Sequence, residues 1–206
     1  MEPLKSQQWS LFDAGEPRFD AQLARVVRTA LAGDAWVDHI PGWLEGHEAL
    51  LDALWTTTRW RSERRMMYER MVDVPRLFAT LPDDGPGHPA LTAMGEALSA
   101  YYRRPLPNVS MAAYRDGRDS VAFHGDRLGI RRADAIVAIV ALGFPRRFLL
   151  RRAGGGSSRQ FSFGGGDLLV MGGTCQLTWE HAVPKAAYAE LRISVQFRSG
   201  FPDDEA

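Results

Sequence analysis

The stretch AIVAIVALGFPRRFLLRRAGGGSSRQFSFGGGDLLVMGG, residues 135–173, decides the fold class because it alternates short apolar segments with glycine-rich turns. Its segments are short and rich in apolar residues, as β-strands are. The triple glycines at 154–156 and 164–166 separate three of these segments as turns. Many short strands with such punctuation indicate a β-sandwich or barrel, and the jelly roll, a double-stranded β-helix, is one member of that class.

Similar segments lie on both sides of this stretch. They are SMAAY (110–114), DSVAFHGD (119–126), QLTWEH (176–181) and RISVQFR (192–198), and each is predicted to be a strand. The second half of the chain is therefore predicted to be built from β-strands. We find no internal repeat and no heptad pattern.

Before about Pro105 the apolar residues recur with helical periodicity. Helices are predicted in PRFDAQLARVVRTALAG (17–33), GHEALLDALW (46–55) and HPALTAMGEALSAYYRR (88–104), with Pro89 suited to an early helical position. We expect an α+β protein with three parts in one globule. They are N-terminal helical support with a nucleotide-recognition lid (1–105), a jelly-roll core (106–201) and an acidic tail (202–206).

Composition limits the classes of function. The chain has 206 residues with 45% hydrophobic content, and its 25 basic and 25 acidic side chains cancel. No global charge therefore attracts the protein to a polyanion or an anionic membrane, so any binding to nucleic acid has to be local. The single cysteine, Cys175, and the lack of a signal-like N-terminus favour a cytoplasmic protein. The longest apolar run is also too short to span a bilayer.

A candidate metal site begins with His124 and Asp126 in FHGD. Side chains alternate along a strand, so these two point to the same face. His181, in TWEHAVPK, is the candidate for a third ligand from a distant strand. Two histidines and one carboxylate form the iron face that leaves three coordination positions open for a bidentate co-substrate and O₂. An isolated H-x-D is a weak signal, and an incidental pair on a surface is the alternative.

The strand RISVQFR strengthens the metal interpretation. Arg192, Ser194, Gln196 and Arg198 share one of its faces, and Ile193, Val195 and Phe197 share the other. The polar face lines a ligand cavity or faces solvent, and the pattern alone gives both alternatives similar weight. A cavity arginine suits 2-oxoglutarate, which chelates iron at its keto acid end and leaves its far carboxylate to a cationic partner.

The second half, from about Asn108 to Arg198, resembles the AlkB family of Fe(II)- and 2-oxoglutarate-dependent nucleic-acid demethylases. The motifs are YRDGRDSVAFHGD (114–126), LGFPRRFLLR (142–151), GDLLVMGGTCQLTWEHAVPK (166–185) and RISVQFR (192–198). In the first half, AWVDHIPGWL (35–44) and RRMMYERMVDVPR (64–76) are similar to the first core strand and the substrate lid of the DNA-repair branch.

The resemblance implies roles for six residues. His124, Asp126 and His181 would bind Fe(II), and Arg192 would pair with the distal carboxylate of 2-oxoglutarate. Tyr114 would donate a hydrogen bond to the co-substrate, and Arg198 would lie near the keto acid end and the iron-binding carboxylate. Two positions depart from the family: Ala112 replaces a common asparagine, and Leu128 replaces an acidic residue that touches the flipped base.

The expected substrate is an alkylated base in DNA or RNA, in a single strand or flipped from a duplex, where aromatic and apolar side chains hold it. Candidate substrate contacts are Trp60, Met66, Met67, Tyr68 and Leu128. Six arginines between residues 59 and 76 outnumber three acids there, and a second arginine-rich stretch spans 127–159, so both are candidate phosphate contacts. A small-molecule or protein substrate and a non-catalytic binding module are the alternatives. We expect a monomer.

Overall fold

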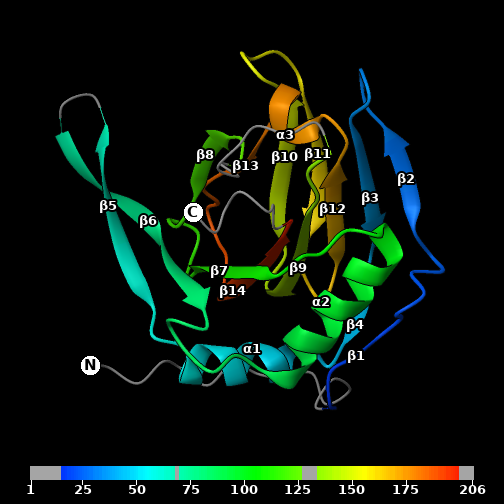
Figure 1. Ribbon diagram of the computed structural model, residues 1–206. Coiled ribbons are helices and arrows are strands. Elements are labelled where there is room, and N and C mark those ends of the chain that lie inside the picture. Colours follow the sequence, from blue (N-terminus) through cyan, green and yellow to red (C-terminus); the bar gives the residue numbers. More distant parts are fainter. Residues whose placement is uncertain (1–14, 68–69, 127–133, 200–206) are drawn as a thin grey trace, which may run out of the picture.

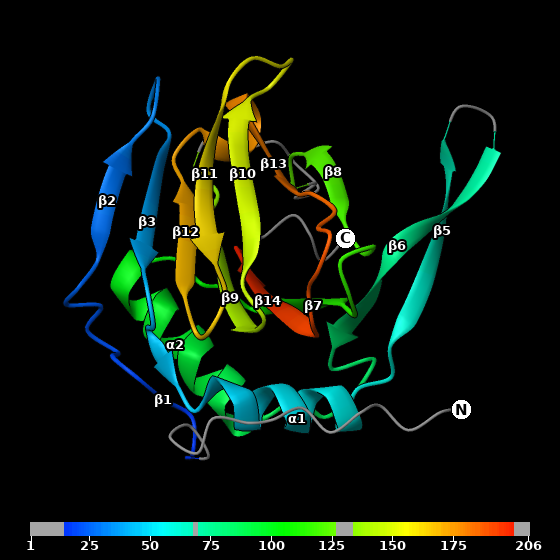
Figure 2. The same ribbon diagram turned by 180° about the vertical axis from the view of Figure 1, so that it is seen from behind.

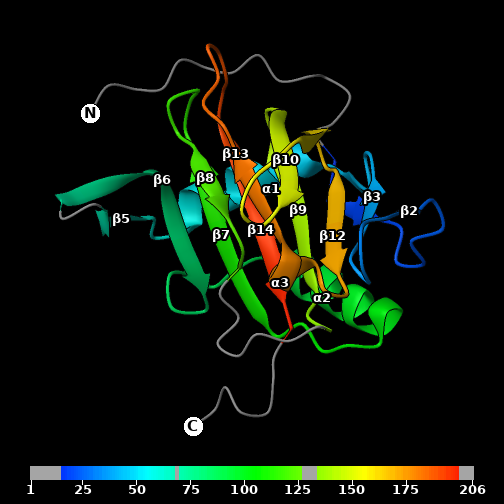
Figure 3. The same cartoon turned by 90° about the horizontal axis from the view of Figure 1, so that it is seen from above.

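The computed structural model describes residues 15–67, 70–126 and 134–199, and two β-sheets form its centre (Figure 1). The larger sheet has eight strands in the order β2-β3-β12-β9-β14-β7-β6-β5, and the smaller has four in the order β11-β10-β13-β8. Figure 3 shows strands of the smaller sheet lying over those of the larger one. This is the double-stranded β-helix that the sequence predicts.

The strands of the larger sheet are β2 (Val27–Ala30), β3 (Trp36–Ile40), β5 (Arg61–Met67), β6 (Arg70–Leu81), β7 (Asn108–Tyr114), β9 (Val137–Gly143), β12 (Leu168–Gly172) and β14 (Arg192–Arg198). The smaller sheet contains β8 (Val121–His124), β10 (Arg146–Arg152), β11 (Ser158–Phe163) and β13 (Trp179–Val183). The remaining elements are β1 (Arg18–Phe19), β4 (Leu44–Glu45), α1 (His47–Thr57), α2 (Pro89–Tyr102) and α3 (Cys175–Thr178).

Two hydrophobic clusters lie on opposite faces of the larger sheet. One contains leucines of α1 and α2 packed against Ile193, Val195 and Phe197 of β14. The other lies between the two sheets and includes Phe148 and Phe163 of the smaller sheet. Because β14 turns its apolar side chains to the helices, its polar side chains point between the sheets. The cavity alternative for this polar face is therefore the correct one.

The β5–β6 hairpin extends away from the two sheets (Figures 1 and 2). Its base is continuous with the larger sheet, because Leu77 to Leu81 of β6 pair with residues of β7. The first half of the chain thus supplies strands to the core sheet as well as helices. Two of its three predicted helices are confirmed, as α1 and α2, and Pro89 opens α2.

The helix predicted over residues 17–33 is wrong. Asp20 accepts hydrogen bonds from the backbone N–H groups of Gln22 and Ala24 through its carboxylate, which stabilises a turn in place of a helix. Leu23 adopts a left-handed φ of 49° in that turn, and its side chain is buried. The following residues form β2, which pairs with β3.

The strand predicted over QLTWEH begins later than expected. Cys175–Thr178 form the short helix α3, in which the carbonyl oxygen of Thr174 accepts hydrogen bonds from the N–H groups of Leu177 and Thr178. The strand β13 then begins at Trp179. None of the helices in the described part of the chain is long and apolar enough to cross a membrane.

Candidate metal centre

A pocket of about 400 Å³ opens between the two sheets. Its walls come from β6, β7, β9 and β14 of the larger sheet and from β8, β10 and β13 of the smaller one. His124, Asp126 and His181 all line it. The volume lies in the range typical of small-molecule sites. A larger hollow of about 1270 Å³ lies along α2 and the 81–89 loop, away from these three residues. The smaller pocket is therefore the candidate site.

Strand pairing brings the three predicted metal ligands together. His124 of β8 lies directly opposite His181 of β13, and their ring centroids are 4.3 Å apart. Asp126 follows β8, and its Oδ2 lies 4.0 Å from His181 Nε2. One ligand atom from each residue lies within 4.8 Å of the others, and no other such cluster occurs among residues 15–67, 70–126 and 134–199.

Neighbouring groups orient these ligand atoms. His124 Nδ1 lies 2.8 Å from the Ala122 carbonyl oxygen, so Nδ1 carries the proton and Nε2 keeps a lone pair for a metal ion. Arg198 Nη2 donates to Asp126 Oδ1 at 2.9 Å. The other carboxylate oxygen, Oδ2, is buried without a hydrogen-bond partner in the described structure. A buried anionic oxygen beside two imidazoles fits a divalent cation, which would satisfy it.

The protonation states suit a cation. Burial lowers the pKa of both imidazoles, and that of His181 falls to about 3. Burial, the largest single influence, raises the pKa of Asp126, but the charge and hydrogen bond of Arg198 together with the two neighbouring imidazoles outweigh it and hold the pKa at about 2. At neutral pH the three side chains are therefore two neutral imidazoles and one carboxylate. Such deprotonated donors bind a metal ion without first losing protons.

Arg192 is fully buried behind this pocket. Its Nη1 donates to Ser194 Oγ at 2.8 Å, and the rings of Tyr114 and Phe163 lie 5.2 Å and 5.4 Å from its Cζ. Its Nε and Nη2 have no hydrogen-bond partner in the described structure. Burial lowers the pKa of this guanidinium to about 10. Two unpartnered N–H groups on one buried cation fit a carboxylate ligand, which accepts both together.

A chain of hydrogen bonds that the sequence did not reveal supports Arg198. Arg198 Nη1 donates to Ser110 Oγ, and that hydroxyl donates to Gln196 Oε1 at 3.0 Å. Strand alternation places all three side chains on the pocket faces of β7 and β14. In the sequence, the alternation of SMAAY and RISVQFR indicates that these side chains share a face. It does not indicate which of them form hydrogen bonds with one another. This chain holds the guanidinium against Asp126.

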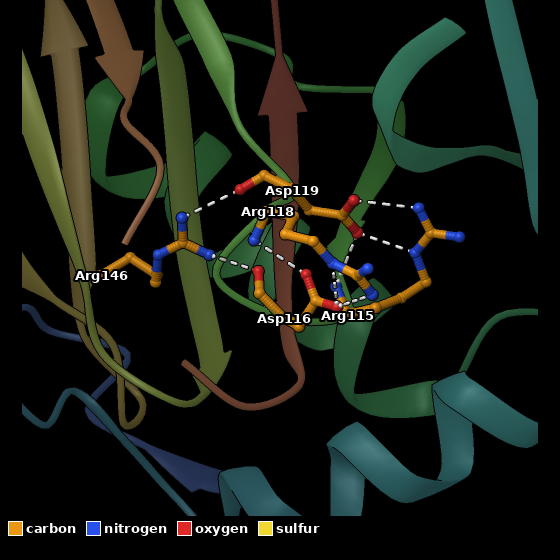
Figure 4. A network of polar contacts seen from close by, with 5 residues as sticks. All are labelled: Arg115, Asp116, Arg118, Asp119 and Arg146. Carbon is orange, nitrogen blue, oxygen red and sulfur yellow. Dashed lines mark hydrogen bonds and ion pairs between the residues drawn. The ribbon is translucent and has the colours of Figure 1, made fainter. Parts of the chain in front are cut away.

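The loop between β7 and β8 is held by a second polar network (Figure 4). Arg146 Nη2 donates to the carbonyl oxygens of Asp119 and Pro184 at 2.9 Å and 2.7 Å, and Nη1 donates to that of Asp116 at 3.1 Å. One buried guanidinium thus connects the loop before β8 with the segment after β13. Those two strands carry the metal-ligand candidates. Its role corrects the interpretation of Arg146 as a phosphate contact.

The predicted substrate contacts have different outcomes. Trp60 is not in the pocket: its ring packs 5.7 Å from that of Trp55, and its Nε1 donates to the Trp55 carbonyl oxygen. Trp60 therefore packs between the hairpin and α1, and its predicted contact with the substrate stays a prediction. Met66 and Met67 lie in β5, but their side chains lie outside the described part of the structure. Tyr68 and Leu128 lie outside the described residues.

Comparison with known proteins agrees with this geometry. The family model of the 2OG-Fe(II) oxygenase superfamily matches residues 38–198. The chain is 24% identical to human "Alpha-ketoglutarate-dependent dioxygenase alkB homolog 3" over 224 residues, which cover 97% of this chain and 78% of the relative.

Solved structures show the same fold. A protein described as "The structure of OsALKBH1" has a TM-score of 0.58 at 12% identity and covers 84% of this chain and 100% of its own. A prolyl hydroxylase from Trichoplax adhaerens, in complex with a peptide fragment, also has a TM-score of 0.58, at 11% identity with 82% and 84% coverage. Because the family model spans most of the chain, the protein belongs to the 2OG-Fe(II) oxygenase superfamily, which uses Fe(II), 2-oxoglutarate and O₂.

Proposed function

We propose that this oxygenase is an AlkB-like demethylase that removes alkyl groups from bases in DNA or RNA and releases formaldehyde, succinate and CO₂. The observation that carries the oxygenase chemistry is the pair of unsatisfied groups in one site. Asp126 Oδ2 and the Nε and Nη2 atoms of Arg192 are buried without hydrogen-bond partners in the described structure. Iron and 2-oxoglutarate, bound together, supply both partners.

The roles follow from the contacts. His124, Asp126 and His181 hold Fe(II), while Arg198 fixes the carboxylate of Asp126. Arg192 pairs with the distal carboxylate of 2-oxoglutarate, and the Tyr114 hydroxyl donates a hydrogen bond to the co-substrate. When bound, iron and 2-oxoglutarate use O₂ to hydroxylate a substrate C–H bond while the co-substrate loses CO₂. The chain's part is to orient these groups and to keep bulk water from Arg192, which is fully buried.

A nucleic-acid substrate is supported by the relatives and by charge. The human relative is an alkB homologue, and its similarity extends over 97% of this chain. An N-methyl group hydroxylated at carbon breaks down to formaldehyde and the free base, so one oxidation completes the repair. The arginine-rich β5–β6 hairpin lies beside the pocket, where Arg76 and Phe78 of β6 form part of the wall. Arginines there can contact phosphate groups.

A protein substrate is the second candidate. The solved neighbour from Trichoplax adhaerens is a prolyl hydroxylase in complex with a peptide fragment, so a protein with this fold can bind a peptide. Two features of the sequence favour the same alternative. Leu128 stands where repair enzymes of the AlkB family commonly carry an acidic residue, and the net charge of the chain is zero.

We further propose that the protein is cytoplasmic and acts as a monomer. A monomer would keep the pocket open to a large substrate.

Formaldehyde release tests this proposal. The iron-loaded protein is given methylated oligonucleotides, methylated free nucleosides or peptides, with 2-oxoglutarate and O₂. We expect release from oligonucleotides, and binding to them that weakens steeply as salt concentration rises. His124→Ala should abolish succinate formation, whereas the control His88→Ala, a histidine that caps α2, should not. Turnover of peptides alone would overturn the nucleic-acid assignment, and full turnover by His124→Ala would overturn the iron site.

A further inference from the structure

Arg76 has a contact in the pocket that its place in the arginine-rich hairpin does not reveal. It is half-buried on β6 and lines the pocket. Its Nη1 donates to the Tyr114 hydroxyl oxygen at 3.2 Å. The register explains the contact: Leu77 pairs with Ala113 and Phe78 with Ala112, so the next position places Arg76 beside Tyr114. Among the described residues no carboxylate forms an ion pair with Arg76.

The backbone at Arg76 is fixed from both sides. Leu77 is paired to β7, and the carbonyl oxygen of Pro75 accepts a hydrogen bond from Ser120 N at 2.8 Å. Ser120 follows Asp119, whose carboxylate accepts three hydrogen bonds from Arg115 (Figure 4). Arg76 therefore sits where the base of the hairpin joins the loop before β8. It is a rigid part of the pocket wall.

The polarity of the hydrogen bond sets the direction of the Tyr114 proton. A guanidinium can only donate, so the Tyr114 oxygen is the acceptor of this bond and its own proton is free for another acceptor. Tyr114 is buried, with 2% of its surface exposed, and it lines the pocket that would hold the co-substrate. The Arg192 guanidinium, with its two unpartnered N–H groups, lies 5.2 Å from the Tyr114 ring. An anionic ligand on Arg192 would therefore lie beside the Tyr114 side chain.

We infer that Arg76 is a positioning residue for 2-oxoglutarate, acting through Tyr114: it fixes the hydroxyl as a donor toward the co-substrate and links co-substrate binding to the base of the β5–β6 hairpin. The inference rests on the proposed function, since it requires 2-oxoglutarate on Arg192. Tyr114 is the donor that β7 can offer here. Ala112 has no polar side chain, and the Ser110 hydroxyl already donates to Gln196.

Anaerobic titration calorimetry of the iron-loaded, full-length protein with 2-oxoglutarate tests this inference. Arg76→Met and Tyr114→Phe should each weaken binding roughly tenfold, which corresponds to about 1.4 kcal/mol. The double variant should be no weaker than either single one, because the two side chains act as one unit. Arg76→Lys should recover part of the affinity, since a lysine, unlike a methionine, can donate one bond. Arg147→Met, which removes an exposed arginine of β10, is the matched control.

Each outcome has one meaning. Wild-type affinity in Arg76→Met would overturn the inference. Additive losses in the double variant would also overturn it, because Arg76 would then act on the ligand without Tyr114. Iron content and melting temperature of the variants should match the wild type, which separates positioning from a general loss of structure. If the wild type does not bind 2-oxoglutarate, or if Arg192→Ala binds it normally, the proposed function itself fails.

Discussion

Replacing Arg192 with methionine should make the ligand-free protein more stable and deprive it of 2-oxoglutarate. Burial lowers the pKa of this guanidinium from its usual value to about 10, so folding disfavours its charged form. That shift corresponds to about 3 kcal/mol. The variant also loses the hydrogen bond to Ser194, which contributes about 1 kcal/mol. The net gain is about 2 kcal/mol, or roughly 4–8 °C in melting temperature for a chain of this size.

The same melting experiment also tests the binding of 2-oxoglutarate. In the wild type, 2-oxoglutarate at 100 times its dissociation constant should add about 2.7 kcal/mol of stability. In Arg192→Met it should add nothing. Melting curves recorded without O₂, with Fe(II) present and with or without 2-oxoglutarate, measure both effects. Arg151→Met is the control, since Arg151 is partly exposed and paired with Glu180. A less stable Arg192→Met, or one that 2-oxoglutarate still stabilises, would refute the reasoning.

Three further predictions follow from the same contacts. Asp126→Asn keeps the shape of the ligand but removes its charge, so anaerobic Fe(II) titration should show a large loss of affinity; tight binding would contradict it. The pKa of His181 is about 3 in the fold and 6.5 when unfolded, so the metal-free protein should lose roughly 2 kcal/mol of stability between pH 6.5 and pH 5, because the unfolded state takes up the proton first. His181→Gln should flatten that slope in urea melts at several pH values. Arg146→Gln leaves three carbonyl oxygens without their donor, so calorimetry should show a loss of about 3 kcal/mol, and an unchanged melting temperature would show that the clamp is unimportant.

Much of the site was predictable from strand alternation. The alternation in RISVQFR separated the polar side chains from Ile193, Val195 and Phe197. The spacing of His124 and Asp126 predicted that they share one face, and they do meet, although β8 ends at His124 and Asp126 follows it. Both patterns have a period of two, and a strand imposes that period on its side chains. Whether the polar face of β14 met solvent or a cavity depended on what packs against its apolar face. The helices α1 and α2 pack there, and the sequence of the strand alone does not predict this contact.

Other features depended on contacts between distant segments. The apolar spacing of residues 17–33 fits a helix, but the side chain of Asp20 captures nearby N–H groups and pairing with β3 draws Val27–Ala30 into a strand. Arg76 and Arg146 were two arginines among many in sequence. Their separate roles come from the partners that β7 and the 116–119 loop supply, and no local pattern in the sequence identifies those partners.

Electron density for a complex with Fe(II) and 2-oxoglutarate, prepared without O₂, tests the central claim most directly. We predict a metal ion bound to His124, Asp126 and His181, with the distal carboxylate of the co-substrate on Nε and Nη2 of Arg192. A metal ion bound at other residues, or a co-substrate that leaves those two nitrogens unpartnered, would contradict the assignment.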